Sequence, residues 1–114
     1  MADHIKNLEQ SRARGKALKE GAPKVMGHFQ AMHDEVCKDG TLPFKTKELA
    51  AIGIGVAIRC ECCINHHVNL AVKAGATRAE VLEIIEVAVL MGGGPSTHYG
   101  AAALEAYDQI SGAE

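Results

Sequence analysis

Glycine and proline divide this chain into about six stretches of helix length, and this division limits the available folds more than any other feature. Gly21 ends the first stretch, and Pro23, a residue favoured in the first turn of a helix, opens the second. Gly40 and Gly75 close two further stretches, and the run Gly92–Pro95 separates the last two. Apolar residues recur at helical spacing within most of these stretches. We therefore predict an all-α fold of about six helices.

One stretch, residues 49–58, has an ambiguous pattern. Isoleucine and valine alternate along it as in a strand, and Gly53 and Gly55 disfavour a helix. No other run looks like a partner strand, and a strand without a partner has no ladder of hydrogen bonds. We therefore predict a buried helix, with Thr46 as its N-cap and Glu48 in its first turn, where the helix dipole favours an anion.

The second half of the chain carries clearer helix signals. Residues 65–73 follow helical spacing up to Gly75. Thr77, with Glu80 three residues later, has the pattern of a capping box at a helix start. A last helix is predicted to run from Pro95 to about Ile110. The glycines before Pro95 indicate a tight turn or close packing.

Composition fits one domain with a core of small side chains. The 114 residues are 47% hydrophobic but only 4% aromatic, with no tryptophan. One compact domain spanning residues 1–114 must therefore build its core from alanine, valine, isoleucine, leucine and methionine. Such side chains bury little area each, so we expect self-association to add burial.

Charge and hydropathy exclude several partners. The net charge is −2 and no dense lysine or arginine block is present, so a nucleic-acid surface is not predicted. The first residues lack the apolar segment of a secretory signal, and the longest uncharged runs are too short to cross a bilayer. We expect a cytoplasmic protein without a membrane partner. In a reducing compartment, clustered cysteines are more often catalytic or metal-binding than structural.

The segment CECCINHH, residues 60–67, concentrates the reactive side chains. Cys60 and Cys63 form a C-x-x-C pair, and at a helix start this spacing brings both sulfurs to one turn, close enough to bond. Free N–H groups and the dipole there stabilise a thiolate. His67 lies four residues after Cys63, on the same helix face, and can take its proton directly or through a water. His66 lies about 100° further around the helix, on the surface or lining a pocket.

With Glu48 twelve residues before Cys60, the pattern becomes E-x(11)-C-x-x-C-x-x-x-H. This pattern resembles the active-site signature of alkylhydroperoxidase D (AhpD) in the carboxymuconolactone decarboxylase superfamily. The resemblance covers roughly residues 42–107. It implies that Cys63 attacks a peroxide, that Cys60 is the resolving thiol that meets the reductant, and that His67 and Glu48 form a proton relay.

The resemblance also implies the wider properties of the protein. It implies a thiol-dependent peroxidase acting on alkyl hydroperoxides or hydrogen peroxide, with an all-helical fold. The redox group would be the Cys60–Cys63 disulfide itself, with no bound cofactor or metal. Partners would be a lipoyl-bearing or other dithiol reductant and further copies of the chain, as a trimer or hexamer. Cys62 stands where this family can have histidine, and with Glu61 it could change the reactivity.

Four alternatives accompany this interpretation. The same thiols would serve a general disulfide reductase or a redox sensor. The superfamily also contains lactone decarboxylases, which do not use redox thiols. A zinc module could use Cys60, Cys63 and His67, although a structural zinc site takes four ligands. Cys37 is expected to be a core residue. His28 and His33 are not expected to share a site, and His98 is expected to be structural.

The position of Glu48 is open at this stage. On one straight helix Glu48 and Cys60 would be about 18 Å apart along the axis. Glu48 can then join the relay through His67 on a folded-back helix, through a kink near Gly53 and Gly55, or from a neighbouring subunit.

Overall fold

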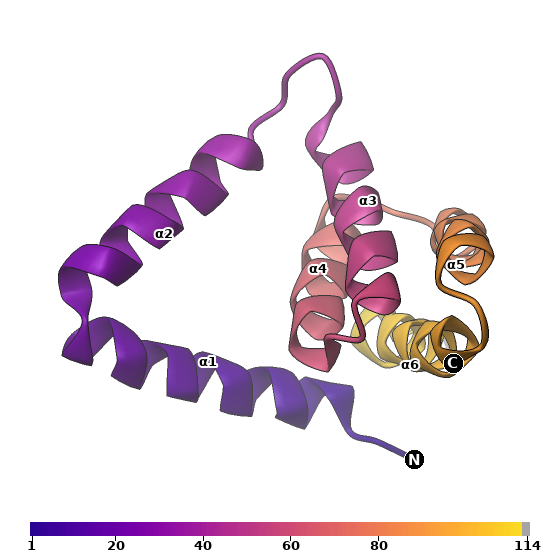
Figure 1. Cartoon of the computed structure of the whole chain (residues 1–114), viewed down its shortest axis with the longest axis horizontal. Helices are drawn as coiled ribbons and strands as arrows, with labels where there is room; N and C mark the ends of the chain where they lie inside the picture. Colours follow the sequence, from indigo (N-terminus) through magenta and orange to yellow (C-terminus); the bar gives the residue numbers. More distant parts are fainter. Residues whose placement is uncertain (113–114) are drawn as a thin grey trace.

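The computed structural model describes residues 1–112, so residues 113–114 of the predicted domain lie outside the described part. Within it the chain is all-helical, as predicted, and contains no strand. The elements are α1 (His4–Gly21), α2 (Pro23–Val36), α3 (Phe44–Ala57), α4 (Glu61–Lys73), α5 (Arg78–Gly92) and α6 (Gly94–Ser111). Figure 1 shows their order in space.

Two predicted helix starts were wrong by a few residues. Helix α3 begins at Phe44 after Pro43, so Thr46 lies inside the helix instead of capping it. Proline has no backbone N–H and a fixed φ, which suits the position just before a helix. Helix α4 begins at Glu61, four residues before the helical spacing that starts at residue 65, because the sulfur of Cys60 acts as its N-cap. The prediction that the C-x-x-C pair lies at a helix N-terminus is confirmed. The prediction of a helix over residues 49–58 is confirmed to Ala57.

Other local signals were confirmed. The Thr77 hydroxyl accepts the Glu80 N–H, and the Glu80 carboxylate accepts the Thr77 N–H, which completes the capping box of α5. Gly93 has a φ of 71°, a left-handed value that suits glycine, at the turn between α5 and α6. A side chain on Gly92 would meet Ser96, so this glycine allows close packing as predicted, and one on Gly100, for which no prediction was made, would meet Ile85.

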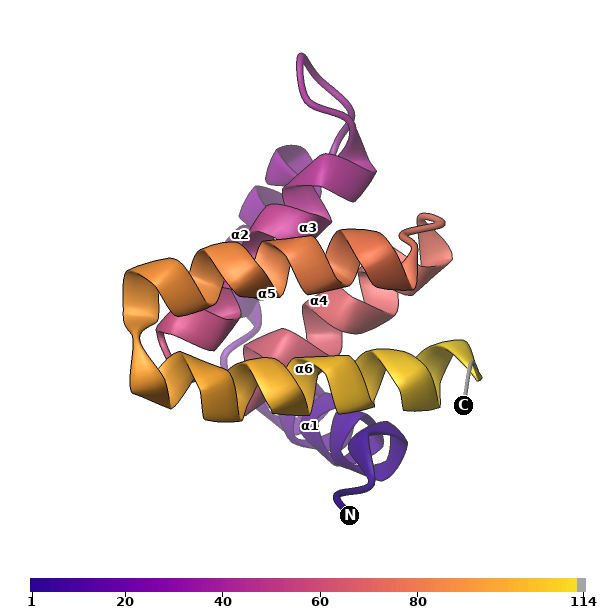
Figure 2. The ribbon, with the colours of Figure 1, turned by 90° about the vertical axis from the view of Figure 1, so that its right-hand side faces the viewer.

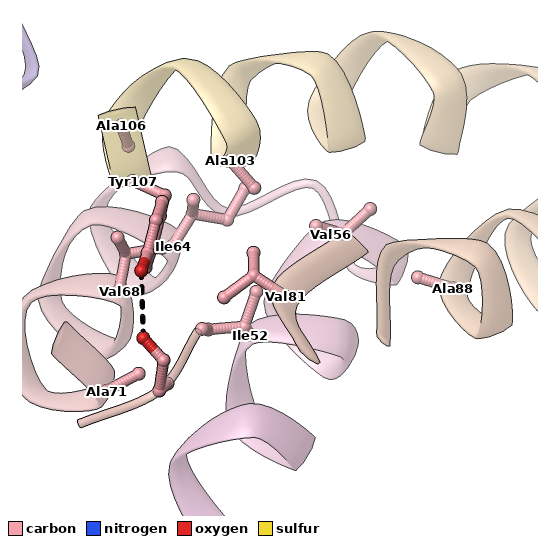
Figure 3. Packing of buried hydrophobic residues seen from close by; sticks show 11 residues of the cluster. Ile52, Val56, Ile64, Val68, Ala71, Val81, Ala88, Ala103, Ala106 and Tyr107 are labelled. Carbon is pink, nitrogen blue, oxygen red and sulfur yellow. Dashed lines mark hydrogen bonds between the residues drawn. The ribbon is translucent and has the colours of Figure 1, made fainter. Parts of the chain in front are cut away.

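Helices α3 to α6 enclose the core, which is built of small side chains as the composition predicted. In Figure 2, α5 and α6 lie side by side across α3 and α4. The buried residues between them are Ile52, Val56, Ile64, Val68, Ala71, Ala76, Val81, Ala88, Ala103, Ala106 and Tyr107. Figure 3 shows the single polar link in this cluster, from the Tyr107 hydroxyl to the Ala76 carbonyl oxygen at 2.9 Å.

The two N-terminal helices form an arm outside this core. Figure 1 shows α2 rising from the end of α1 and standing away from α3. The start of α1 is fixed by the buried His4, which bonds Asn65 of α4 at 2.9 Å and Glu105 of α6 at 2.8 Å. Helix α2 buries none of its residues, and among the helix backbones it approaches only α1. The side chains of His33 and of the following Cys37 reach His66 of α4 and Glu48 of α3. No helix in residues 1–112 has the length and apolarity to cross a membrane.

Candidate active site

The turn between α3 and α4 places the cysteine pair. Arg59 adopts a left-handed φ of 62°, a conformation that costs a residue with a side chain about 1–2 kcal/mol. The next N–H, of Cys60, is donated back to the Gly55 carbonyl at 3.0 Å. The chain therefore reverses within a few residues, and α4 runs back along α3.

Cys60 and Cys63 are joined by a disulfide at the N-terminus of α4. Their Cα atoms are 5.2 Å apart, within the usual range for this bond. The Cys60 sulfur also accepts the backbone N–H of Cys63 at 3.2 Å. The N-terminal peptide dipoles thus point at Cys60 and would stabilise a thiolate there after reduction.

Glu48 and His67 meet across the interface of α3 and α4. Oε2 of Glu48 lies 2.6 Å from Nδ1 of His67. Glu48 is only 1% exposed. Of the three routes that the sequence left open, the structure shows the first: the folded-back helix brings the carboxylate to His67 within one subunit.

The pairing fixes how the imidazole is used. A carboxylate accepts hydrogen bonds and donates none, so Nδ1 of His67 carries the proton that it shares with Glu48. Nε2 is then the nitrogen left for exchange with another group. Cys63 lies one turn before His67 on the same face of α4, as the spacing predicted.

Two residues from the end of α2 join this site, and sequence reasoning missed both. The Cys37 thiol donates to Oε1 of Glu48 at 3.2 Å. His33 lies against the Cys37 sulfur and contacts His66, with 3.1 Å between the Nε2 atoms. Cys37 is half-buried at the site instead of lying in the core, where the sequence had placed it. The spacing of four between His33 and Cys37 was the available signal.

The surroundings shift two pKa values strongly. Burial, followed by the hydrogen bond to Glu48 and the charge of that carboxylate, raises the pKa of Cys37 to about 11. Burial, followed by the neighbouring His67 and His33, lowers the pKa of His66 to about 4. At neutral pH Cys37 is therefore a thiol and His66 is uncharged.

An apolar pocket of about 210 Å³ opens beside the Glu48–His67 pair. It lies between α2, α3 and α4. Its lining residues are Phe29, Met32, His33, Val36, Cys37, Lys47, Glu48, Ala51 and His67. Lys47 and Glu48 are the lysine and the carboxylate of this lining. The Lys47 ammonium already donates to the Val36 and Lys38 carbonyl oxygens at 2.9 and 2.7 Å, so it is engaged outside the pocket.

Comparison with known proteins places this arrangement in a family. The family model described as "Carboxymuconolactone decarboxylase family" matches residues 23–106, which is most of the chain. The chain belongs to the carboxymuconolactone decarboxylase family. This confirms the superfamily that the cysteine signature indicated.

Several relatives match this carboxymuconolactone decarboxylase family member over most of their length. A family member from Legionella pneumophila matches with a TM-score of 0.92 and 39% identity, over 95% of this chain and 96% of that one. A Thermotoga maritima member, for which a role in an antioxidative response has been suggested, matches with a TM-score of 0.72 and 27% identity, over 83% and 86% of the chains. An uncharacterised protein of the Paracoccus denitrificans cox locus is 35% identical over 113 residues, 99% of this chain and 100% of the relative.

The remaining candidates lie apart from the Glu48–His67 pair in this family member. Cys62 is exposed and lines a polar pocket with Arg14 and other residues of α1. His98 packs against the Tyr99 ring and lines a further pocket, beside His4. Among the described residues, no group of three or more histidine, cysteine or acidic side chains is arranged to hold a metal ion.

Proposed function

We propose that this carboxymuconolactone decarboxylase family protein is a thiol-dependent peroxidase that reduces alkyl hydroperoxides or hydrogen peroxide. One observation carries the proposal. A C-x-x-C disulfide at a helix N-terminus lies one turn from His67, and a buried carboxylate, Glu48, holds that histidine. A dithiol beside a histidine base is the arrangement that thiolate chemistry requires.

The catalytic cycle starts from the reduced pair. His67 takes the proton of the Cys63 thiol, and Glu48 stabilises the resulting imidazolium. The Cys63 thiolate attacks the distal oxygen of the hydroperoxide and the O–O bond breaks. The leaving alkoxide takes the proton from His67 and departs as an alcohol, or as water from hydrogen peroxide. Cys63 is left as a sulfenic acid.

Cys60 closes the cycle. Its thiolate attacks the Cys63 sulfur and displaces the sulfenic oxygen, which leaves as water after taking up the proton that Cys60 gave up. The product is the Cys60–Cys63 disulfide, the state of the described structure. Two electrons have passed from the two thiols to the peroxide. An external dithiol, of the lipoyl type, restores both thiols by exchange and becomes a disulfide itself.

The two sulfurs are supported by different parts of the fold. The N–H of Cys63 points at the Cys60 sulfur, whereas His67 lies one turn from Cys63. After reduction, the helix N-terminus would stabilise the Cys60 thiolate, and His67 would take the proton of Cys63. This division supports the roles of resolving thiol for Cys60 and peroxide-attacking thiol for Cys63.

The apolar pocket supports an organic hydroperoxide as substrate. The Glu48–His67 pair forms part of its wall, and Phe29, Met32 and Ala51 supply apolar surface. An organic group in this pocket would leave its peroxide oxygens near the relay. Hydrogen peroxide has no group to fill the same volume.

Exposed apolar surface supports a homo-oligomer, a trimer or hexamer as the resemblance implies. Val25, Phe29, Met32 and Val36 are all more than half exposed along α2. A second apolar groove, between α3 and α5, is flanked by the exposed Ile54, Val87 and Met91. A second copy of the chain would bury both surfaces. Light scattering of the wild type and of Met91→Glu tests this, since we expect the charge to lower the mass, and a monomeric wild type would refute it.

The decisive experiment is a single-turnover thiol count. The reduced protein, freed of reductant without oxygen, receives one equivalent of an alkyl hydroperoxide. We expect rapid loss of two thiols, abolished in Cys63→Ser, while Cys62→Ser serves as the matched control that keeps the loss. Thiol loss no faster than that of a free thiol would exclude the peroxidase and leave a disulfide reductase, a metal module or a different chemistry of the superfamily.

A further inference from the structure

We propose that Cys37 is a positioning residue of the proton relay, whose thiol holds the buried Glu48 carboxylate so that its other oxygen meets His67. The role of the relay in peroxide reduction rests on the proposed function. The hydrogen bond from Cys37 to Glu48 does not depend on that function. Cys37 lies outside the C-x-x-C motif and comes from the opposite side of the site.

The two oxygens of Glu48 have different partners. Oε1 accepts the Cys37 thiol at 3.2 Å, and Oε2 accepts Nδ1 of His67 at 2.6 Å. With Glu48 1% exposed, water cannot supply a donor freely. A buried carboxylate needs donors on its oxygens, so each of the two partners takes one side of the group.

Several contacts fix the position of Cys37. The Cys37 N–H is donated to the His33 carbonyl at 3.0 Å, which ends α2 at this residue. The Lys47 ammonium holds the carbonyl oxygens on either side, of Val36 and Lys38. The Phe44 N–H is donated to Asp39 at 2.6 Å and holds the loop that leads into α3. The thiol is therefore presented to Glu48 by a braced chain segment.

The Cys37 thiol stays protonated at neutral pH. Burial and the adjacent carboxylate raise the pKa of Cys37 to about 11, so the thiol stays a donor across the physiological range. A thiol is also a weak donor. It orients the carboxylate while leaving most of the negative charge available to the His67 imidazolium.

Other titratable groups lie around Cys37 and His66 beside this carboxylate, and their roles differ. Asp34 and Lys47 act on the Cys37 thiol, whereas His33, His67 and Arg12 act on His66, which itself interacts with Glu48. Lys47 donates to carbonyl oxygens, and His33 contacts His66 and the far side of the Cys37 sulfur. In the described part of the chain, the side-chain donors recorded on Glu48 are thus Cys37 and His67.

The test is the midpoint of the His67 titration in the oxidised protein, measured by NMR of the labelled imidazole. The disulfide keeps Cys60 and Cys63 from titrating, so neither thiol contributes to the midpoint. A hydroxyl is a stronger donor than a thiol, and Cys37→Ser should lower the midpoint. Cys37→Ala removes the donor and should raise it, because the anion then holds the shared proton more tightly. We expect shifts of about half a pH unit each way.

The matched control is Cys62→Ala, which removes the exposed free thiol and should leave the midpoint unchanged. Equal midpoints in wild type, Cys37→Ser and Cys37→Ala would overturn the proposal, since a packing role predicts no ordered shift. If Cys37→Ala does not fold, a Cys37→Ser midpoint equal to that of wild type overturns it alone.

A second readout separates this inference from the peroxidase proposal. Single-turnover thiol loss should slow about threefold in Cys37→Ala, because the carboxylate loses the contact that positions it against His67, and the hydroxyl of Cys37→Ser should restore the rate. A wild type without peroxide turnover, but with the ordered midpoints, would refute the peroxidase and support the positioning role. Ordinary turnover with equal midpoints would do the reverse.

Discussion

Glu48 and His67 are 19 residues apart in the sequence, and their side chains meet at 2.6 Å between Oε2 and Nδ1. The pair combines a carboxylate that is almost fully buried with a histidine whose side chain is 21% exposed. The buried carboxylate of Glu48 can therefore stabilise a positive charge on His67, which is accessible from outside the protein interior.

Replacing Glu48 by glutamine should slow peroxide reduction without removing the contact. The amide keeps the size of the side chain and an acceptor for Nδ1 of His67, but it has no charge to stabilise an imidazolium. We expect the single-turnover rate of thiol loss to fall by about 100-fold, at the lower end of the range for losing acid–base catalysis. Stopped-flow measurement with an alkyl hydroperoxide checks this.

The matched control for that change is Glu83→Gln, which neutralises an exposed carboxylate on α5. It should keep the wild-type rate. A Glu48→Gln variant as fast as wild type would remove Glu48 from the relay.

Enlarging Ala51 should separate organic hydroperoxides from hydrogen peroxide. Ala51 lines the apolar pocket beside Glu48 and His67, and a phenylalanine there would fill much of the space. We expect kcat/KM for cumene hydroperoxide to fall by about tenfold or more, the effect of losing an apolar contact surface, while that for hydrogen peroxide changes little. Ala79→Phe, at an exposed position of α5, is the control. Equal losses for both peroxides would show that the pocket does not hold the organic group.

Parts of this site follow from sequence alone because they share one helix. The spacing of Cys60, Cys63 and His67 is enough to predict that they gather at the start of α4 and along one face. Glu48 meets His67 because the chain reverses at Arg59, which has a left-handed φ. The usual sequence signal for such a φ is a glycine or an asparagine, and this position has neither. The sequence could therefore propose the pair but not the route by which it forms.

The contribution of α2 was beyond the sequence for a different reason. Cys37 reaches Glu48 because Lys47 holds the carbonyl oxygens of Val36 and Lys38. These are tertiary contacts between segments about ten residues apart, and no periodicity records them. Cys37 was predicted to be a core residue because it has no partner nearby in the sequence and free cysteine is commonly buried.

The two free thiols should differ widely in reactivity. At pH 8 only about 1 in 1000 Cys37 side chains is ionised, because its pKa is raised to about 11, and alkylation requires the thiolate. Cys62 is exposed. In the oxidised protein, iodoacetamide should therefore label Cys62 first, and the Cys37 rate should rise about tenfold per pH unit up to about pH 11. Peptide mapping by mass spectrometry measures both rates, and comparable labelling at pH 8 would contradict the burial of the Cys37 thiol against Glu48.

Acid should destabilise the fold through His66. Burial, with His67 and His33 beside it, lowers the pKa of His66 from 6.5 to about 4. Between these values the unfolded chain binds a proton at this side chain and the folded protein does not, so stability falls as the pH drops from about 6.5 to about 4. Because His66 is only partly buried, solvent screening limits the effect to about 1–2 kcal/mol.

Urea unfolding of His66→Gln at pH 7 and pH 4.5 should show a smaller loss of stability than wild type. His28→Gln, at an exposed position of α2, should lose as much stability as wild type. Equal losses in all three proteins would show that His66 is protonated in the folded state as readily as in the unfolded chain.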